Sequence, residues 1–302
     1  MAVTDFLHIS ERFSIPGILT FNKQENDFIF ITVSNPHANA SICLYGAQIL
    51  SFCNKNNSEI LWMSPLSNFS RGKAIRGGIP VCFPWFGPDK TQKGMPQHGF
   101  GRLMVWEISE TTQQTSGETK IILRLDSSEN TRAYWPHDFT AEIIILVGQT
   151  LKVTLKVTNV SERQFEYSCA LHSYFKISGI DDIKIEGLEG AEYYENDKPG
   201  KFIQTTSNLE IHGIVDRHYY NTQTTCIIDD PNNKRKIYAD KSGSKVTTVW
   251  NPWSDNCLKM SDMPDNAYTD FVCVEAVNSF DDTILLNPGE CHETTALIRA
   301  EV

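Results

Sequence analysis

Leu151-Lys152-Val153-Thr154-Leu155-Lys156-Val157-Thr158 alternates apolar and polar side chains without a break. Successive side chains of a β-strand point to opposite faces, so this period of two predicts a half-buried strand of an antiparallel sheet. Runs rich in β-branched and aromatic residues predict further strands at residues 28–33, 121–125, 141–147, 183–185, 225–228, 245–250, 271–277 and 294–298. Turn residues, among them Gly117, Gly148 and Gly289, separate these runs.

Apolar stripes of helical period and helix length are hard to find along the chain, so the alternating strands and helices of a parallel sheet are not expected. We predict an all-β protein with little helix, built as a large antiparallel β-sandwich. No linker or charge block interrupts the strand pattern, which favours one domain over residues 1–302, with residues 1–26 unassigned. The absence of a repeat of fixed period argues against a propeller.

Composition excludes several classes of partner. The 302 residues carry a formal charge of −10, which disfavours binding to nucleic acid or to an anionic membrane. No C-x-x-C pair occurs among the eight cysteines, which are predicted to be reduced core residues. The first residues lack the pattern of a secretory signal, and the apolar runs are too short to span a bilayer. A cytoplasmic protein is expected.

Residues 71–102 are basic although the protein is acidic, since they hold six Lys or Arg residues and one Asp. Within them Arg76-Gly77-Gly78 offers a guanidinium beside two glycines, which let backbone N–H groups approach a ligand. An arginine fork suits phosphate or carboxylate, so the segment predicts a site for a small anion. The alternative is a solvated basic loop that pairs with surface acids.

An aromatic stretch follows, Pro80-Val81-Cys82-Phe83-Pro84-Trp85-Phe86-Gly87-Pro88, and after it Pro96-Gln97-His98-Gly99-Phe100-Gly101-Arg102. Sugars present apolar C–H faces and rings of hydroxyls, so a cleft for them needs an aromatic wall with amide, carboxylate and arginine partners. The alternative is that Phe83, Trp85 and Phe86 belong to the core.

Two ionisable residues interrupt apolar strand-like runs. His172 lies in such a segment and, taken alone, suits a structural, hydrogen-bonded histidine. Glu275 interrupts residues 271–277 and shares the face of Phe271, Cys273 and Val277. A carboxylate buried there would be costly unless it is paired or functional, so the candidates are a general base with a raised pKa and an ion pair with an arginine behind the sheet. Asp216 by itself is an ordinary loop carboxylate.

An ordered set of motifs resembles the aldose 1-epimerase superfamily, whose fold is galactose mutarotase-like, and within it the hexose-6-phosphate mutarotase branch, also called glucose-6-phosphate 1-epimerases. The motifs extend from about residue 27 to the C-terminus: Arg76-Gly77-Gly78-Ile79-Pro80, Pro96-Gln97-His98-Gly99-Phe100, Leu171-His172-Ser173-Tyr174-Phe175, Val249-Trp250-Asn251-Pro252-Trp253, Val274-Glu275 and Leu286-Asn287-Pro288-Gly289-Glu290.

The resemblance implies a β-supersandwich without a cofactor that interconverts the α and β anomers of glucose 6-phosphate and related sugar phosphates. It assigns His172 as the catalytic acid and Glu275 as the base, with an ionised glutamate beside a protonated histidine. It assigns substrate binding to Gln97 and Asp216, which would hold ring hydroxyls, and to Arg76 and Arg102, which would clamp the phosphate. His98 matches a histidine of the same cleft.

Three alternatives stay open. An aldose 1-epimerase acting on free sugars would use the same pair without the arginine clamp. A glycoside hydrolase could pair Asp216 with Glu275, with carboxyl groups about 5 to 5.5 Å apart if retaining and about 6.5 to 9.5 Å if inverting. A non-catalytic carbohydrate-binding sandwich would need only the aromatics. No ligand-spaced histidine cluster predicts a metal site, and a monomer whose partner is a small sugar phosphate is expected.

Overall fold

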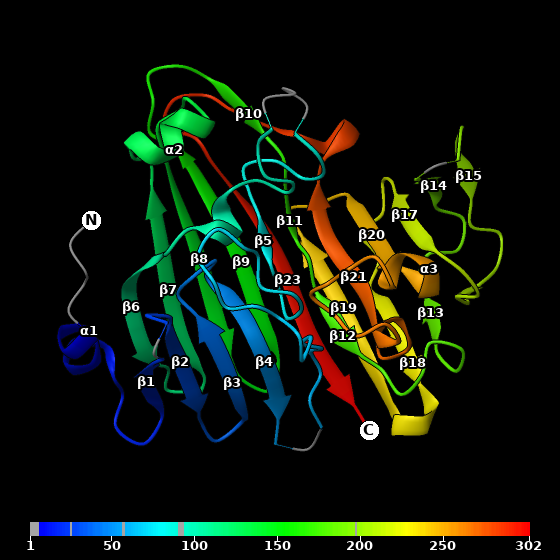
Figure 1. The fold of residues 1–302 in the computed structure, drawn as a ribbon, viewed down its shortest axis with the longest axis horizontal. Coiled ribbons are helices and arrows are strands. Elements are labelled where there is room, and N and C mark those ends of the chain that lie inside the picture. The colour runs from blue at the N-terminus through cyan, green and yellow to red at the C-terminus, as the bar shows by residue number, and fades with distance from the viewer. Residues whose placement is uncertain (1–5, 25, 56–57, 90–93, 197) are drawn as a thin grey trace.

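The computed structural model describes residues 6–24, 26–55, 58–89, 94–196 and 198–302. Strands dominate, and every pairing between named strands in these residues is antiparallel (Figure 1). The predicted all-β class is therefore confirmed.

The largest sheet has nine strands. Their order is β16-β13-β18-β19-β23-β9-β8-β7-β6. The strands are β16 (Asn208–Leu209), β13 (Lys184–Glu186), β18 (Cys226–Asp230), β19 (Arg235–Ser242), β23 (Cys291–Glu301), β9 (Leu151–Asn159), β8 (Phe139–Val147), β7 (Thr119–Asp126) and β6 (Glu107–Gln113).

Two further sheets lie against it in Figure 1. The four-stranded sheet consists of β1 (Leu19–Lys23), β2 (Ile29–Ser34), β3 (Ala38–Cys43) and β4 (Gln48–Asn54). The eight-stranded sheet runs in the order β15 (Phe202–Ile203), β14 (Glu192–Glu195), β17 (Val215–Tyr219), β20 (Val246–Asn251), β21 (Phe271–Asn278), β11 (Cys169–Leu171) and β5 (Val81–Cys82), and β12 (Tyr174–Lys176) also pairs with β21. A two-stranded sheet joins β10 (Phe165–Tyr167) to β22 (Ile284–Leu286).

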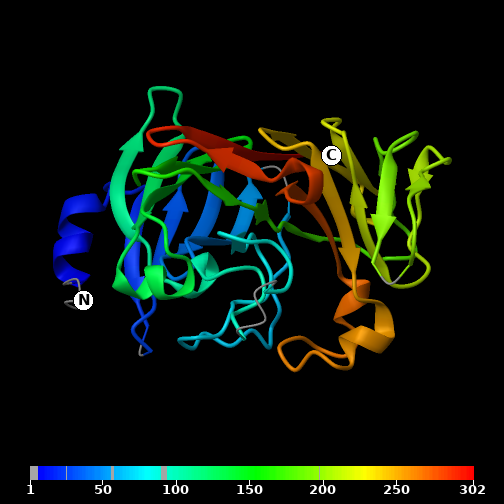
Figure 2. The ribbon, with the colours of Figure 1, turned by 90° about the horizontal axis from the view of Figure 1, so that it is seen from above.

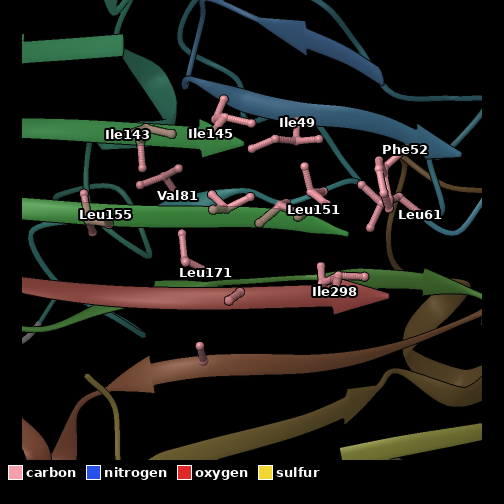
Figure 3. Packing of buried hydrophobic residues seen from close by; sticks show 14 of the residues in the cluster. Ile49, Phe52, Leu61, Val81, Ile143, Ile145, Leu151, Leu155, Leu171 and Ile298 are labelled. Atoms are coloured by element: carbon pink, nitrogen blue, oxygen red, sulfur yellow. The ribbon is translucent and has the colours of Figure 1, made fainter. Parts of the chain in front are cut away.

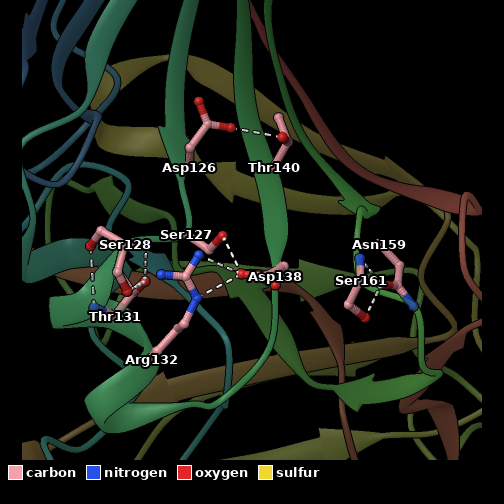
Figure 4. A network of polar contacts seen from close by, with 9 residues as sticks. All are labelled: Asp126, Ser127, Ser128, Thr131, Arg132, Asp138, Thr140, Asn159 and Ser161. Carbon is pink, nitrogen blue, oxygen red and sulfur yellow. Dashed lines mark hydrogen bonds and ion pairs between the residues drawn. The ribbon is translucent and has the colours of Figure 1, made fainter.

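Helices are short and peripheral. They are α1 (Phe6–Phe13), α2 (Glu129–Tyr134) and α3 (Trp253–Cys257), with 3-10 turns η1 (Gly101–Leu103), η2 (Pro231–Asn233), η3 (Ala267–Thr269) and η4 (Phe280–Asp282). A capping box begins α2: Ser128 Oγ accepts from the Thr131 N–H, and Thr131 Oγ1 accepts from the Ser128 N–H (Figure 4). Arg132 pairs with Asp138 at 2.7 Å and fastens the turn that leads into β8.

The alternating stretch that opened the sequence forms most of β9. Its apolar residues are buried, whereas its lysines are exposed or half-buried. Thr154 departs from the pattern, since its hydroxyl is buried and bonded to the Thr295 hydroxyl of β23 at 2.8 Å. The other predicted strands also lie on observed strands, and four of them (28–33, 183–185, 225–228 and 245–250) begin one residue too early.

The core lies between the sheets. One cluster of buried apolar side chains extends from Ile9 to Ala300, and Figure 3 shows Ile49, Ile143, Leu151 and Ile298 packed between layers. Ile9 brings α1 into this core, so part of the unassigned first segment is structural. That residues 1–302 form a single domain stays a prediction, which the continuous core favours.

Loops gather on one side of the molecule. The segment that carries α3 and η3 and the long connection between β4 and β6 project in the same direction (Figure 2). They flank the face of the eight-stranded sheet that does not join the main core. Among the described residues, no helix is long and apolar enough to span a membrane.

Candidate active site

β21 separates two environments along its two faces. Val272, Val274 and Ala276 belong to the main core. Phe271 and Cys273 belong to a second apolar cluster on the other face, and Val277 belongs to a third. Glu275 lies on that outer face between the second and third clusters, as its predicted alignment with Phe271, Cys273 and Val277 requires.

Polar residues lie opposite one another on the three neighbouring strands β21, β20 and β17, and together they form a polar row that starts at Glu275. Thr248 of β20 lies opposite Glu275, and His218 of β17 lies opposite Thr248. On the other side, the chain passes from β11 to β12 through His172 and Ser173. His172 Nε2 then lies 3.4 Å from Glu275 Oε1.

The His172–Glu275 pair is almost sealed from solvent. Glu275 is 2% exposed and His172 is 8% exposed. Oε2 of Glu275 is buried without a hydrogen-bond partner among the described residues. An unsatisfied buried acceptor is costly in a folded protein, so this oxygen is a candidate contact for a ligand hydroxyl. The alternative ion pair with an arginine behind the sheet is wrong, because the ionisable partner at Glu275 is His172.

Burial opposes charge on both groups. Desolvation, helped by the negative Asp216, raises the pKa of Glu275 well above its usual value. Desolvation also lowers the pKa of His172, and the positive charges of Arg102 and Arg76 add to this. Burial therefore works against the predicted pair of ionised glutamate and protonated histidine, which stays a prediction. A neutral imidazole beside a carboxylic acid holds the same single proton without buried charge.

His98 reaches the pair from the loop after β5. Its backbone takes a left-handed φ of 58°, and its ring lies edge-on to His172 with centroids 5.9 Å apart. Nδ1 accepts a hydrogen bond from the Gly87 N–H at 3.1 Å. Burial, with the charge of Arg102, lowers the pKa of His98 to about 3. A neutral His98 carries its proton on Nε2, which leaves that nitrogen as a donor.

The fork of Arg76 is already engaged. Nε and Nη2 each lie 3.0 Å from Oδ2 of Asp262, and Nη1 donates to the Tyr174 hydroxyl at 3.0 Å. These contacts use three of the five N–H groups of a guanidinium. The ring of Tyr174 stacks on His172 at 4.8 Å, so Arg76 also supports the catalytic candidate. The anion clamp stays a prediction, and a bound phosphate would share Arg76 with Asp262.

Arg102 is less fully paired. Its Nη2 donates to the Gln97 carbonyl at 2.8 Å, and its Nε is buried without a hydrogen-bond partner among the described residues. Gln97 itself is exposed. Two of the basic residues that suggested an anion site, Lys90 and Lys93, lie outside the described residues.

The glycines beside Arg76 serve the packing of the chain. A Cβ on Gly78 would lie 2.1 Å from the Ile49 carbonyl oxygen, and one on Gly77 would lie 2.5 Å from that of Trp62. The Gly78 N–H donates to the Trp62 carbonyl at 2.7 Å. The expectation that the two glycines bring backbone N–H groups to a ligand therefore fails at Gly78, whose N–H is already bonded to a neighbouring segment.

The predicted aromatic wall is only partly correct. Phe83 is fully buried in the main core, and the half-buried Trp85 packs against that core and donates from Nε1 to the Pro96 carbonyl. Phe86 does reach the site, with ring centroids 5.0 Å from His98 and 6.0 Å from His218.

Asp216 lies two residues before His218 on β17, opposite Trp250 of β20. Its Oδ1 lies 3.4 Å from His218 Nε2, and its Oδ2 accepts from Asn196 Nδ2 at 2.6 Å. This carboxylate lies in β17 and is oriented by two neighbours, so it is not the ordinary loop carboxylate of the alternative interpretation.

Sequence reasoning missed four residues of this arrangement: Tyr174, His218, Thr248 and Asp262. His218 had a signal, because residues two apart in a strand share a face and it follows Asp216 at that spacing. Tyr174 was quoted only as part of a motif. No three His, Cys, Asp or Glu side chains among the described residues are placed to share a metal ion.

Comparison with known proteins gives consistent results. The sequence model of the aldose 1-epimerase family matches residues 30–299. A Salmonella typhimurium protein named "Putative glucose-6-phosphate 1-epimerase" is 35% identical over 275 residues, which cover 89% of this chain and 91% of that protein. A protein of the same name from Cenchrus ciliaris is 34% identical, over 83% of this chain and 78% of that protein.

Comparison with solved structures supports the same family and fold. A "putative mutarotase" from Salmonella typhimurium superposes with a TM-score of 0.88 at 31% identity, over 95% of both chains. A galactose mutarotase-like protein from Clostridium acetobutylicum has a TM-score of 0.72 at 15% identity, over 94% of this chain and 98% of the other, and supports the fold alone. The predicted galactose mutarotase-like fold is confirmed.

Proposed function

Because the chain belongs to the aldose 1-epimerase family, we propose that it is a hexose-6-phosphate mutarotase that interconverts the α and β anomers of glucose 6-phosphate. The observation that carries the proposal is the buried contact of 3.4 Å between His172 Nε2 and Glu275 Oε1. The reaction needs one proton acceptor and one proton donor at the same pyranose, and this pair supplies both.

The step balances with the single proton that the pair holds. Glu275 takes the proton of the C1 hydroxyl while His172 delivers one to the ring oxygen, and the bond between C1 and that oxygen breaks. The open aldehyde rotates about C1–C2. Reclosure on the other face returns both protons with the roles reversed. Such acid–base groups contribute about 10²- to 10⁴-fold each, which suffices because the reaction already proceeds slowly in water.

These roles require the proton on His172, whereas burial favours it on Glu275. The phosphate of the substrate supplies a reason for the shift. A phosphate bound at Arg76 and Arg102 offsets two of the positive charges that lower the pKa of His172. A phosphorylated sugar thus favours the catalytic form of the pair more than a free sugar does.

The remaining predicted residues provide binding groups. Asp216, Gln97 and His98 would hold ring hydroxyls, and Arg76 and Arg102 would hold the phosphate. Hydroxyl contacts of this kind fix the ring so that O1 and O5 meet Glu275 and His172. Because proton transfer needs only side chains already present, the proposed reaction uses no cofactor.

A second candidate is an aldose 1-epimerase acting on free sugars. The observation that favours it is the ion pair between Arg76 and Asp262, which weakens the case for a dedicated phosphate clamp. The hydrolase and the non-catalytic sandwich gain no such support, since Glu275 contacts His172 directly.

The test is the rate of anomer exchange of freshly dissolved α-glucose 6-phosphate, followed by polarimetry or NMR with and without the protein. Faster exchange that requires Glu275 supports the proposal. Acceleration of glucose equal to that of its 6-phosphate would favour the second candidate, and no acceleration of either would refute both.

We also propose that the protein acts as a monomer in the cytoplasm, with no nucleic-acid or membrane partner. The charge of −10, the free thiols of the eight cysteines and a phosphorylated small-molecule substrate support this setting. Size-exclusion chromatography with light scattering tests the oligomeric state.

A further inference from the structure

His218 is a buried histidine to which the proposed mechanism gives no role. It lies in the polar row of β17, β20 and β21, two residues from Asp216 and opposite Thr248. Its two ring nitrogens contact different groups. Nε2 lies 3.4 Å from Asp216 Oδ1, and Nδ1 lies 2.8 Å from Thr248 Oγ1.

The contacts of His218 determine which of its two ring nitrogens carries the hydrogen. Burial lowers the pKa of His218 to about 4, so the ring is neutral near pH 7 and carries one N–H. An ionised carboxylate only accepts hydrogen bonds, whereas a hydroxyl can donate. The ring hydrogen therefore lies on Nε2, the nitrogen nearer to Asp216, and Nδ1 accepts from the Thr248 hydroxyl.

The ring has little freedom to turn away. Phe280 lies against it with centroids 4.7 Å apart, and Phe86 stands edge-on at 6.0 Å. Tyr194 of β14 occupies the opposite position in the register, and the charge of His218, were it protonated, would act on His98. Among the residues that the structure describes, the charged and titratable groups placed against His218 are Asp216, His98 and Tyr194.

Asp216 is consequently held from two sides, by His218 at Oδ1 and by Asn196 at Oδ2. We propose that His218 is a positioning residue: as the neutral Nε2–H tautomer it fixes the Asp216 carboxylate in the orientation that accepts a substrate hydroxyl. The inference rests on the proposed function, because it gives Asp216 a ring hydroxyl of the sugar to bind. His218 itself touches no reacting atom.

The kinetic test compares two substitutions. His218→Phe keeps an aromatic ring beside Phe86 and Phe280 but removes the Nε2 contact with Asp216 and the hydrogen bond with Thr248. His218→Gln can still place an amide N–H near Asp216. A polar contact that orients a charged binding group changes substrate affinity by roughly tenfold or more. We expect His218→Phe to raise KM for glucose 6-phosphate at least tenfold with kcat within about threefold, and His218→Gln to recover most of the loss.

His212→Gln is the matched control, since the exposed His212 also contacts a carboxylate at 3.4 Å, that of Glu210. It should leave both constants unchanged. An unchanged KM in His218→Phe, or a loss confined to kcat, would overturn the proposal.

Nitrogen-15 NMR of the wild-type imidazoles tests the tautomer without catalysis and without any variant that must fold. We expect His218 to show a protonated Nε2 and an unprotonated Nδ1 from pH 8 down to about pH 5. A charged ring at pH 7, or a proton on Nδ1, would overturn the proposal. Failure of the proposed function would look different: the wild-type protein would not accelerate anomer exchange, whatever the tautomer of His218.

Discussion

Glu275→Gln should remove most of the activity and make the protein more stable at neutral pH. The amide matches the shape of the carboxyl group but cannot accept a proton from the C1 hydroxyl. Loss of one general base costs about 10²- to 10⁴-fold in rate, or about 3 to 5 kcal/mol of transition-state stabilisation. Polarimetry of α-glucose 6-phosphate measures this loss.

The gain in stability follows from the burial of Glu275. Its pKa in the folded protein is raised above the usual 4.5, so above pH 4.5 the folded state keeps a proton that the unfolded state has lost. The wild-type protein therefore loses stability as the pH rises toward that folded-state pKa, by up to about 1.4 kcal/mol per pH unit. Glutamine carries no such proton. The stability difference between variant and wild type should be positive at pH 7.5 and vanish near pH 4.

Urea unfolding at the two pH values measures the difference. Glu195→Gln is the matched control, because Glu195 is also buried but lies 2.9 Å from Lys198 and 3.4 Å from Arg217. That variant should keep its rate and lose stability. If Glu275→Gln retained the wild-type rate, Glu275 would not be the base. If the variant were destabilised at pH 7.5 as Glu195→Gln is, burial would not disfavour the charged form of Glu275.

The other predictions concern the second catalytic candidate, the anion site and the framework. His172→Ala should lose most of the catalysed rate while circular dichroism shows an intact fold; full activity would remove His172 from the mechanism. Arg76→Ala should weaken the use of glucose 6-phosphate with little change on glucose, and an equal loss on both sugars would contradict the clamp. Asp230→Asn breaks a fully buried contact of 3.1 Å with Arg235, so urea unfolding should show a loss of about 3 to 5 kcal/mol while the rate per folded molecule is kept; a loss below about 1 kcal/mol would contradict this.

Long strands can be predicted from the sequence because their alternation of apolar and polar residues matches the alternation of buried and exposed side chains in the structure. The alternation at residues 151–158 and the mixed run at residues 271–277 became β9 and β21, and the second also placed Glu275 on the correct face. Short strands such as β5, with two residues, are too brief to show any period. They are defined by their pairing with neighbouring strands, as β5 is by its pairing with β11.

The candidate site was predicted in part for a similar reason. The face of the strand on which Glu275 lies follows from the alternation of residues 271–277. Its contact with His172, however, depends on pairing between segments about a hundred residues apart. Asp262 illustrates the limit. It lies in a loop without periodicity and meets Arg76 across 186 positions of sequence, so no local signal announces the pair. Phe83 was ambiguous because aromatic residues suit a core as well as a sugar cleft.

The alternation along β21 has a consequence for how this enzyme class can diverge. If the preceding register were kept, an insertion of one residue just before Glu275 would turn its carboxylate toward Val272 and the sealed interior, and the inserted residue would take the catalytic position. Length changes near Glu275 are therefore better tolerated in the connections, such as the segment from α3 to η3, than within β21. New substrate preferences should accordingly arise by changes in these connections, while the number of residues in the central strands stays the same.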